Sequence, residues 1–121
     1  MIKTTPRFAR VISALVISTG MLSAGTAFAN DDLIAKGKEV AWDRKKGNCL
    51  GCHMMGDGAQ PGNIGPALVA MKYRYPDKAK LREQIYDSTK ANPNSIMPPF
   101  GKHGALSDAE IDAITEYVYT L

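Results

Sequence analysis

The chain has 121 residues, 45% of them hydrophobic, which is room for one domain of ordinary globular composition. Its formal net charge of +3 comes from 15 basic and 12 acidic residues. Because three of the basic residues lie within the first ten positions, the rest of the chain is neutral. A neutral domain lacks the basic surface that binds nucleic acid, so we expect no nucleic-acid partner.

Residues 1–29 have the three parts of a secretory signal peptide. A basic start without an acid is followed by a run of apolar or small residues and by Ala27-Phe28-Ala29, a small-x-small cleavage site. The apolar run is shorter than the roughly 20 residues that span a bilayer, which makes a membrane anchor the less favoured alternative. We therefore expect cleavage before Asn30 and a periplasmic domain of residues 30–121 that is not attached to a membrane.

The rest of the chain shows helical spacing of apolar residues and none of the alternation typical of strands. A first helix is predicted to begin at Asp31 or Asp32 and to end at Gly47 and Asn48. A short helix follows over 67–72, and a third begins after Asp77 as its N-cap. The last helix is predicted to begin with a capping box, Ser107 and Glu110, and to run to Leu121. The predicted fold class is all-α, with three to five helices.

Two irregular segments interrupt these helices, GDGAQPGNIGP (56–66) and NPNSIMPPFGKHG (92–104). Long loops without secondary structure are uncommon in so small a domain. They are reasonable if they wrap a bulky non-protein group, and small domains often need such a support.

Charge is distributed unevenly along the chain. Basic residues gather over 72–82 and acidic residues over 108–116. Such runs are usually solvated helix faces, and a docking patch for a partner is the alternative.

The segment CLGCH (49–53) holds both cysteines and one of the two histidines. Zinc needs four ligands, and the chain offers only His103 as a fourth, fifty positions away. A thioredoxin-like redox pair is expected in a βαβ unit, and no strand is predicted here. CxxCH is the spacing for covalent attachment of c-type haem. On a helical turn Cys49, Cys52 and His53 share one face and can all contact one flat ligand.

In a c-type site each cysteine forms a thioether with the haem, and His53 ligates the iron. Met97 is the favoured sixth ligand, because Pro98 and Pro99 restrict its backbone and 44 positions separate it from His53. Two alternatives remain, His103 as the ligand and Met97 as a core residue. His/Met ligation raises the iron potential and fills both axial positions, which favours electron transfer.

With CLGCH, GNIGP and IMPPFGKHG, the chain resembles class I cytochromes c and, more closely, the SoxX family of monohaem subunits of sulfur-oxidation SoxAX complexes. The resemblance runs from about Gly47 to Leu121. Its most specific parts are PGNIGPALVAMKYRYPDKAKLREQIYD, NPNSIMPPFGKHGALSDAEID and YVYTL. It implies a class I cytochrome c-like fold wrapped around one covalently bound haem c.

The resemblance also implies roles for single residues. It places thioether links at Cys49 and Cys52, and the axial ligands at His53 and Met97. The carbonyl of Pro66 should accept a hydrogen bond from the second ring nitrogen of His53 and so fix the ring. The first and last helices should cross with Gly37 near Tyr117, as in class I cytochromes.

By the same resemblance, the chain pairs with a SoxA-type cytochrome in a heterodimer that acts as an L-cysteine S-thiosulfotransferase. That complex joins thiosulfate oxidatively to a cysteine of a SoxY-type carrier protein and passes two electrons to small c-type cytochromes. Since haem takes both cysteines of this chain, we expect it to relay electrons and the partner to hold the catalytic residue.

Two other functions stay open. A freely diffusing periplasmic cytochrome c that shuttles electrons to an oxidase would need only the generic features. Haem-based ligand sensing would need an open iron position, so rapid carbon monoxide binding to the reduced protein would support it and count against Met97 as a ligand.

Overall fold

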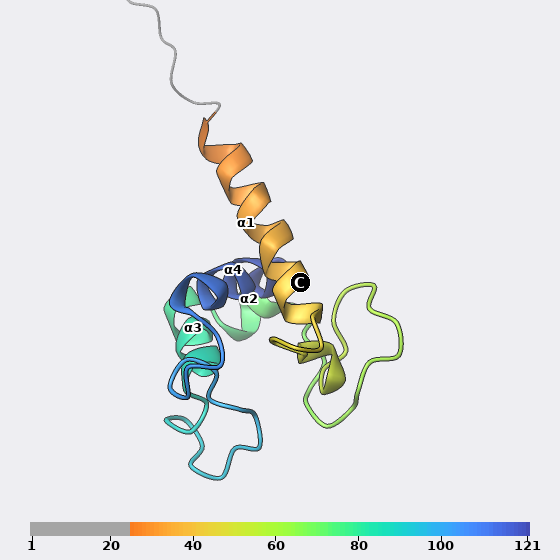
Figure 1. Ribbon diagram of the computed structural model, residues 1–121, viewed down its shortest axis with the longest axis vertical. Coiled ribbons are helices and arrows are strands. Elements are labelled where there is room, and N and C mark those ends of the chain that lie inside the picture. The colour runs from red at the N-terminus through yellow and green to blue at the C-terminus, as the bar shows by residue number, and fades with distance from the viewer. Residues whose placement is uncertain (1–24) are drawn as a thin grey trace, which may run out of the picture.

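The computed structural model describes residues 25–121, with side chains from Asn30 onward. Figure 1 shows the arrangement of its elements, and their order is α1 (Gly25–Trp42), the short 3₁₀ turn η1 (Cys49–Gly51), α2 (Met71–Arg74), α3 (Lys78–Tyr86) and α4 (Asp108–Tyr119). Over this range the chain forms no β-strand, only an isolated bridge between Met55 and Leu68. The all-α prediction is confirmed, with four α-helices.

The predicted signal peptide lies almost entirely outside the described residues. Its last five positions, 25–29, form the first turn of α1, so this helix runs through the predicted cleavage position before Asn30. The helix was expected to begin at Asp31 or Asp32, and that boundary is wrong. Good helix formers such as Ala27 and Ala29 precede the aspartates, and no proline or glycine after Gly25 stops the helix there.

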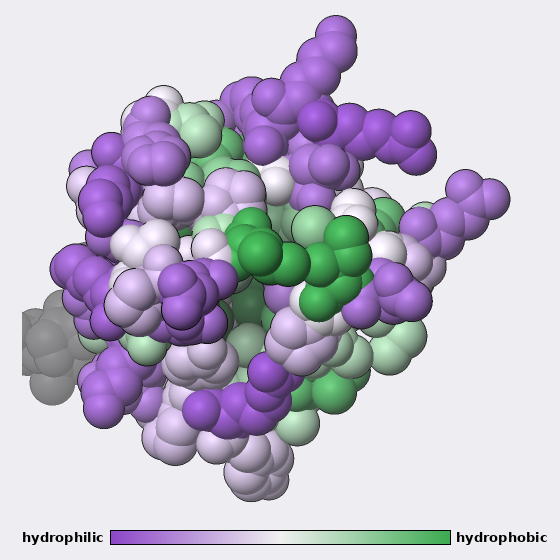
Figure 2. Space-filling model, turned by 90° about the horizontal axis from the view of Figure 1, so that it is seen from below, coloured by the Kyte–Doolittle hydropathy of each residue, from purple (hydrophilic) through white to green (hydrophobic). Residues whose placement is uncertain are grey.

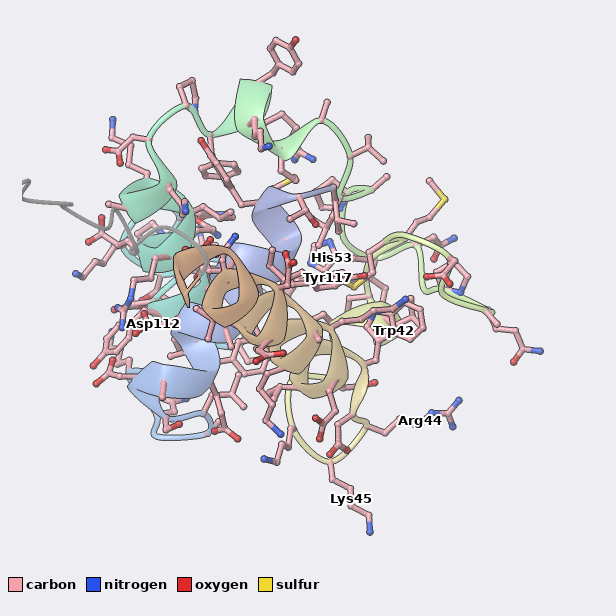
Figure 3. The ribbon with its side chains drawn as sticks, turned by 90° about the horizontal axis from the view of Figure 1, so that it is seen from above. Trp42, Arg44, Lys45, His53, Asp112 and Tyr117 are labelled. Carbon is pink, nitrogen blue, oxygen red and sulfur yellow. The ribbon has the colours of Figure 1, made fainter. Side chains whose placement is uncertain are left out.

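Helices α1 and α4 cross in close contact, and this crossing organises the core (Figures 1 and 3). Gly37 of α1 is buried at the crossing, where an added Cβ would lie 1.9 Å from the Ala113 carbonyl oxygen and 2.9 Å from Tyr117 Cβ. The glycine is therefore tolerated inside a helix because another backbone occupies the space of a side chain. The buried apolar cluster around the crossing comprises Val40, Ala41, Met55, Met71, Leu81, Ile85, Phe100, Leu106, Ile111, Ile114, Tyr117 and Val118.

The start of α4 is fixed by the predicted capping box. The Ser107 hydroxyl accepts from the Glu110 backbone N–H, and the Glu110 carboxylate accepts from the Ser107 backbone N–H. Lys46 donates to the same carboxylate at 2.5 Å, and this contact, together with the hydrogen bonds from Ser107, lowers the pKa of Glu110 to about 2. The box thus ties the first turn of α4 to the segment that precedes CLGCH.

Substituting Ser107→Ala is expected to lower the free energy of unfolding by about 1 kcal/mol, because it removes the acceptor for an N–H at the helix start. For a domain of this size that corresponds to a melting temperature about 4–8 °C lower. Thermal unfolding followed by circular dichroism measures the change. Ser107→Thr keeps the acceptor and serves as the control, and an equal loss in both variants would contradict the capping explanation.

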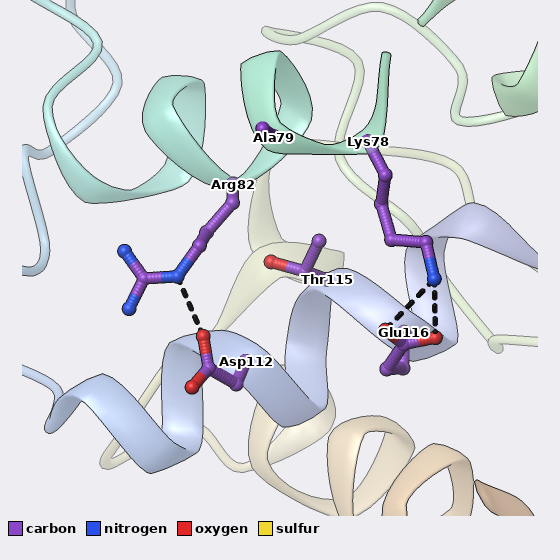
Figure 4. Close-up of a pocket in the computed structure, with 6 residues that line it drawn as sticks. All are labelled: Lys78, Ala79, Arg82, Asp112, Thr115 and Glu116. Carbon is purple, nitrogen blue, oxygen red and sulfur yellow. Dashed lines mark hydrogen bonds and ion pairs between the residues drawn. The ribbon is translucent and has the colours of Figure 1, made fainter. Parts of the chain in front are cut away.

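The basic and acidic segments pair with each other between α3 and α4. Lys78 donates to both carboxylate oxygens of Glu116 at 2.9 Å, and Arg82 donates to Asp112 at 2.5 Å (Figure 4). Hydrogen bonds to Asp112 and then to Asp108 raise the pKa of Arg82. Such partly exposed pairs contribute little stability each. They pair two of the basic residues, Lys78 and Arg82, with acidic residues of α4, and so take up part of the charge that in the sequence also allowed a docking patch.

The short helix predicted over 67–72 is misplaced, since α2 begins only at Met71. Leu68 instead donates its N–H to the Met54 carbonyl and pairs with Met55 in the isolated bridge. Ala70 then has a φ of +52°, a left-handed conformation that a continuous helix does not allow. None of the helices within residues 25–121 is both long and apolar enough to cross a bilayer.

Candidate functional site

The CLGCH segment forms one tight turn directly after α1. The chain leaves α1 at Trp42, reverses through residues 43–48, and enters η1 at Cys49. The Cys49 carbonyl accepts both the Cys52 N–H at 3.1 Å and the His53 N–H at 2.9 Å. One carbonyl therefore holds the backbone of the other two residues, and all three side chains come from a single turn, as their spacing predicts.

The side chain of Cys49 lies in a largely desolvated position at the start of the turn. Burial raises the pKa of Cys49 to about 11, against an opposing backbone hydrogen bond. Neither cysteine forms a disulfide in the described chain, and both are half-buried. Thioredoxin-like cysteines have a lowered pKa that makes the attacking thiolate available. The shift here has the opposite sign, which agrees with the rejection of a disulfide-exchange site.

The GNIGP loop holds the imidazole of His53. Its ring atom Nδ1 lies 2.7 Å from the Pro66 carbonyl oxygen, the contact that the resemblance implied. A carbonyl can only accept, so Nδ1 carries the proton and Nε2 is left with a free lone pair. Gly65 lies close to the ring, since an added Cβ would be 2.4–2.8 Å from Cε1, Nδ1 and Nε2. The ring is thus oriented by a carbonyl and confined by a glycine.

Backbone hydrogen bonds clamp this loop onto the turn. Gly62 donates to the Leu50 carbonyl at 2.9 Å, and Gly65 donates to the Cys52 carbonyl at 2.8 Å. From the other side, the Tyr117 hydroxyl of α4 reaches the following segment, since a Cβ at Gly56 would lie 3.0 Å from it. Figure 3 labels Tyr117 on α4 and His53 on the CLGCH turn. The α1–α4 core therefore positions the turn.

Substituting Gly65→Ala is expected to rotate the His53 ring, because the new methyl group and the imidazole cannot occupy the same space. Overpacking of this kind costs about 1–3 kcal/mol of unfolding free energy. In the haem-bearing protein the electron paramagnetic resonance spectrum of the ferric form should change with the ring orientation. Pro66→Ala retains the accepting carbonyl and is the control, so a spectrum altered equally in both variants would contradict this role of Gly65.

Met97 lies on the second loop, between α3 and α4. Its side chain is half-buried and packs against the core, and its sulfur is 4.0 Å from Nε2 of Gln84. His103 lies further along the same loop and is exposed. The structure brings Cys49, Cys52, His53 and Pro66 into one cluster, whereas Met97 and His103 belong to a separate segment.

The other methionines of the described chain have different surroundings. Met71 is fully buried, as expected of a core residue, and Met55 is buried beside it in the same cluster. Met54 is 51% exposed and adjoins His53 in the chain. Among the methionines of the described chain, Met97 is therefore the one that is neither fully buried in the core nor adjacent to His53 in the sequence.

The surface beside the two loops suits a flat apolar ligand. Figure 2 shows hydrophobic residues gathered around a hollow on the face seen from below. The two loops carry strongly exposed isoleucines, with Ile64 65% and Ile96 79% exposed. Exposed hydrophobic residues that gather in one patch, rather than single ones, mark binding surfaces. The CLGCH turn, the oriented imidazole and the apolar hollow fit a covalently bound haem, which when bound supplies a one-electron iron couple.

The sequence did not identify three residues that shape this region. Gly65 lies against His53, and the sequence contained a hint of this, because Gly65 directly precedes the predicted acceptor Pro66 in GNIGP. Gln84 and Ser88 contact Met97 from the end of α3. No feature of the sequence distinguishes these two from ordinary polar residues of a helix and the turn after it.

Comparison with known proteins agrees with this site. Residues 32–118 match the family model described as "Cytochrome C oxidase, cbb3-type, subunit III". The chain is also 40% identical over 77 residues to a protein of Aquifex aeolicus (strain VF5) named "Uncharacterized lipoprotein". That match covers 62% of this chain and 37% of the relative, so the chain spans little more than a third of the relative's length.

The family match covers well over half of the chain and includes the CLGCH turn, the GNIGP loop and Met97. The helical fold without strands in residues 25–121 is consistent with a class I cytochrome c-like fold. A cytochrome c of this kind holds covalently bound haem c and functions in electron transfer. The chain belongs to the cbb3-type cytochrome c oxidase subunit III family and is a c-type cytochrome domain.

Proposed function

We propose that this chain is the electron-transfer subunit of a SoxAX-type L-cysteine S-thiosulfotransferase, with one haem c. The CLGCH turn, in which both cysteines of the chain stand beside the oriented His53, supports a haem-bearing chain, and the resemblance of the GNIGP and IMPPFGKHG segments to the SoxX family supports the finer assignment. Thioethers at Cys49 and Cys52 leave no thiol for sulfur chemistry. The chain then accepts electrons, while the catalytic group belongs to a SoxA-type partner.

The proposed axial ligands are His53 and Met97. Free Nε2 of His53 is available because Nδ1 is committed to Pro66. A thioether as second ligand favours the reduced iron and leaves no open position for oxygen chemistry. Such a site takes up electrons as thiosulfate is joined to a SoxY-type carrier cysteine and gives them to small c-type cytochromes.

Association with the partner tests the proposal. The mature protein, with its haem, is co-expressed with a SoxA-type cytochrome from the same genome and analysed by gel filtration. Co-elution at the mass of a heterodimer is expected, together with thiosulfate-dependent reduction of the haem when the carrier protein is added. Separate elution and a haem that stays oxidised would contradict the assignment.

The family match supports a second candidate function, because the description of the matching family names a subunit of an oxidase. In that function the chain is a periplasmic cytochrome c that carries electrons to an oxidase. It predicts that the purified protein is a stable monomer and reduces an oxidase preparation without any SoxA-type protein. Purification from native cells grown on thiosulfate distinguishes the two functions. A SoxA-type cytochrome that copurifies supports the first, and a cytochrome that purifies alone supports the second.

We also propose export to the periplasm with cleavage before Asn30. N-terminal sequencing of the protein from native cells tests this directly. A mature chain beginning at Asn30 is expected, and a retained Met1 or a start elsewhere in the helix would contradict it.

A further inference from the structure

Two polar side chains at the end of α3 contact Met97 at different points. Nε2 of Gln84 lies 4.0 Å from the Met97 sulfur, at the long end of the range for hydrogen bonds to sulfur. Ser88, in the turn after α3, donates its hydroxyl to the Met97 carbonyl at 2.6 Å. One contact therefore acts on the thioether and the other on the backbone of the same residue.

The serine side of the Ser88–Met97 contact is fully buried. Ser88 has 0% of its surface exposed, so its hydroxyl has no access to water in place of the Met97 carbonyl. A buried polar group that loses its only partner costs about 1–3 kcal/mol. The Met97 N–H is held as well, by the Ser95 hydroxyl at 3.2 Å. Both backbone groups of Met97 are thus fixed by side chains, in a loop that contains no helix or strand.

The Gln84 contact has an electronic consequence for a thioether ligand. An amide N–H that points at sulfur withdraws electron density from its lone pairs. Weaker donation from the thioether destabilises ferric iron more than ferrous iron, which favours the reduced state. Hydrogen bonds to an axial ligand are among the means by which proteins set haem potentials.

We infer that Gln84 and Ser88 are positioning residues for Met97, with Gln84 adjusting the thioether and Ser88 holding the backbone that presents it. The inference rests on the proposed function, because it needs Met97 as an iron ligand. Under this inference, residues at the end of α3 adjust the haem reduction potential through Met97. Within the described chain, the hydrogen bonds of these two side chains to Met97 are separate from the CLGCH turn.

Redox titration of the haem-bearing protein tests the role of Gln84. Gln84→Leu keeps much of the side-chain volume and removes the N–H donor. The equilibrium constant for reduction should fall by about threefold to tenfold, since one hydrogen bond is lost. For a one-electron couple, a tenfold fall in this constant corresponds to a reduction potential lower by about 59 mV. Gln84→Glu also removes the donor at nearly unchanged shape and should lower the potential further. Ala79→Leu, at the exposed start of the same helix, is the control and should leave it unchanged.

Ligand competition tests the role of Ser88. Ser88→Ala should raise the affinity of the ferric protein for imidazole by about tenfold, because Met97 is released more easily when its carbonyl loses its donor. The sulfur-to-iron absorption band of the imidazole-free variant should remain, which shows that the haem is still bound by Met97. An imidazole affinity equal to that of Ala79→Leu would overturn the role of Ser88.

The outcomes separate this inference from the proposed function. A wild-type ferric protein without the sulfur-to-iron band would remove Met97 as a ligand and, with it, the inference. A wild-type protein with the band, but with potentials of Gln84→Leu and Gln84→Glu equal to the control, would overturn the inference alone. A lowered potential in both variants, with the band retained, supports it.

Discussion

Met97→Ala is expected to abolish the sulfur-to-ferric-iron charge-transfer band and to lower the reduction potential of the haem. The thioether stabilises the reduced iron, and water or a stronger donor that replaces it does so less. A change on the order of 0.1 V is expected, within the roughly 0.8 V over which axial ligands set haem potentials. Absorption spectroscopy and potentiometric titration of the purified protein measure both effects.

The matched control is Met54→Ala. Met54 is exposed and directly follows His53, so its removal should leave the band and the potential unchanged. If Met97→Ala kept the wild-type spectrum, the assignment of Met97 would be refuted. His103→Ala would then be the next variant, because the sequence left His103 as the alternative ligand.

Gly37→Ala is expected to cause the largest loss of stability among the substitutions considered. The added methyl would lie 1.9 Å from the Ala113 carbonyl oxygen, which is backbone and cannot rotate away. Helices α1 and α4 would have to separate, which costs about 3 kcal/mol, the upper end of the usual range for overpacking. That is a large part of the total stability of a small domain, about 5–15 kcal/mol. Urea denaturation of the haem-bearing protein measures the difference.

Lys36→Ala provides the control for Gly37→Ala. Lys36 is the preceding residue on α1, is exposed, and forms only a surface ion pair with Glu39. Its replacement should change the unfolding free energy by less than about 0.5 kcal/mol. Equal stability of Gly37→Ala and Lys36→Ala would show that α1 and α4 do not approach as closely as the structure has them.

Local signals predicted the helices well where they were chemically specific. The capping box Ser107 and Glu110 marks the start of α4, and Asp77 caps α3 by accepting from Ala79. Errors arose where tertiary contacts decide the outcome. Leu68 leaves the predicted short helix because it pairs with the segment after CLGCH, a contact that no local pattern records.

In the candidate site, too, the features set by local spacing were predictable and those set by tertiary contacts were not. The turn that carries Cys49, Cys52 and His53 follows from a spacing of three and four residues. The closeness of Gly65 to the imidazole, and the contacts of Gln84 and Ser88 with Met97, depend on how separate segments fold together. Sequence reasoning could therefore name the candidate ligands and could not name the residues that orient them.

The central claim, that CLGCH binds haem covalently, is tested most directly by the intact mass of the denatured protein purified from its native cells. The account predicts the mass of the mature polypeptide plus one haem, with neither cysteine available to a thiol reagent. Cys49→Ser and Cys52→Ser should each weaken this retention, since each removes one thioether. A mass equal to the bare polypeptide, with both thiols reactive, would contradict the claim.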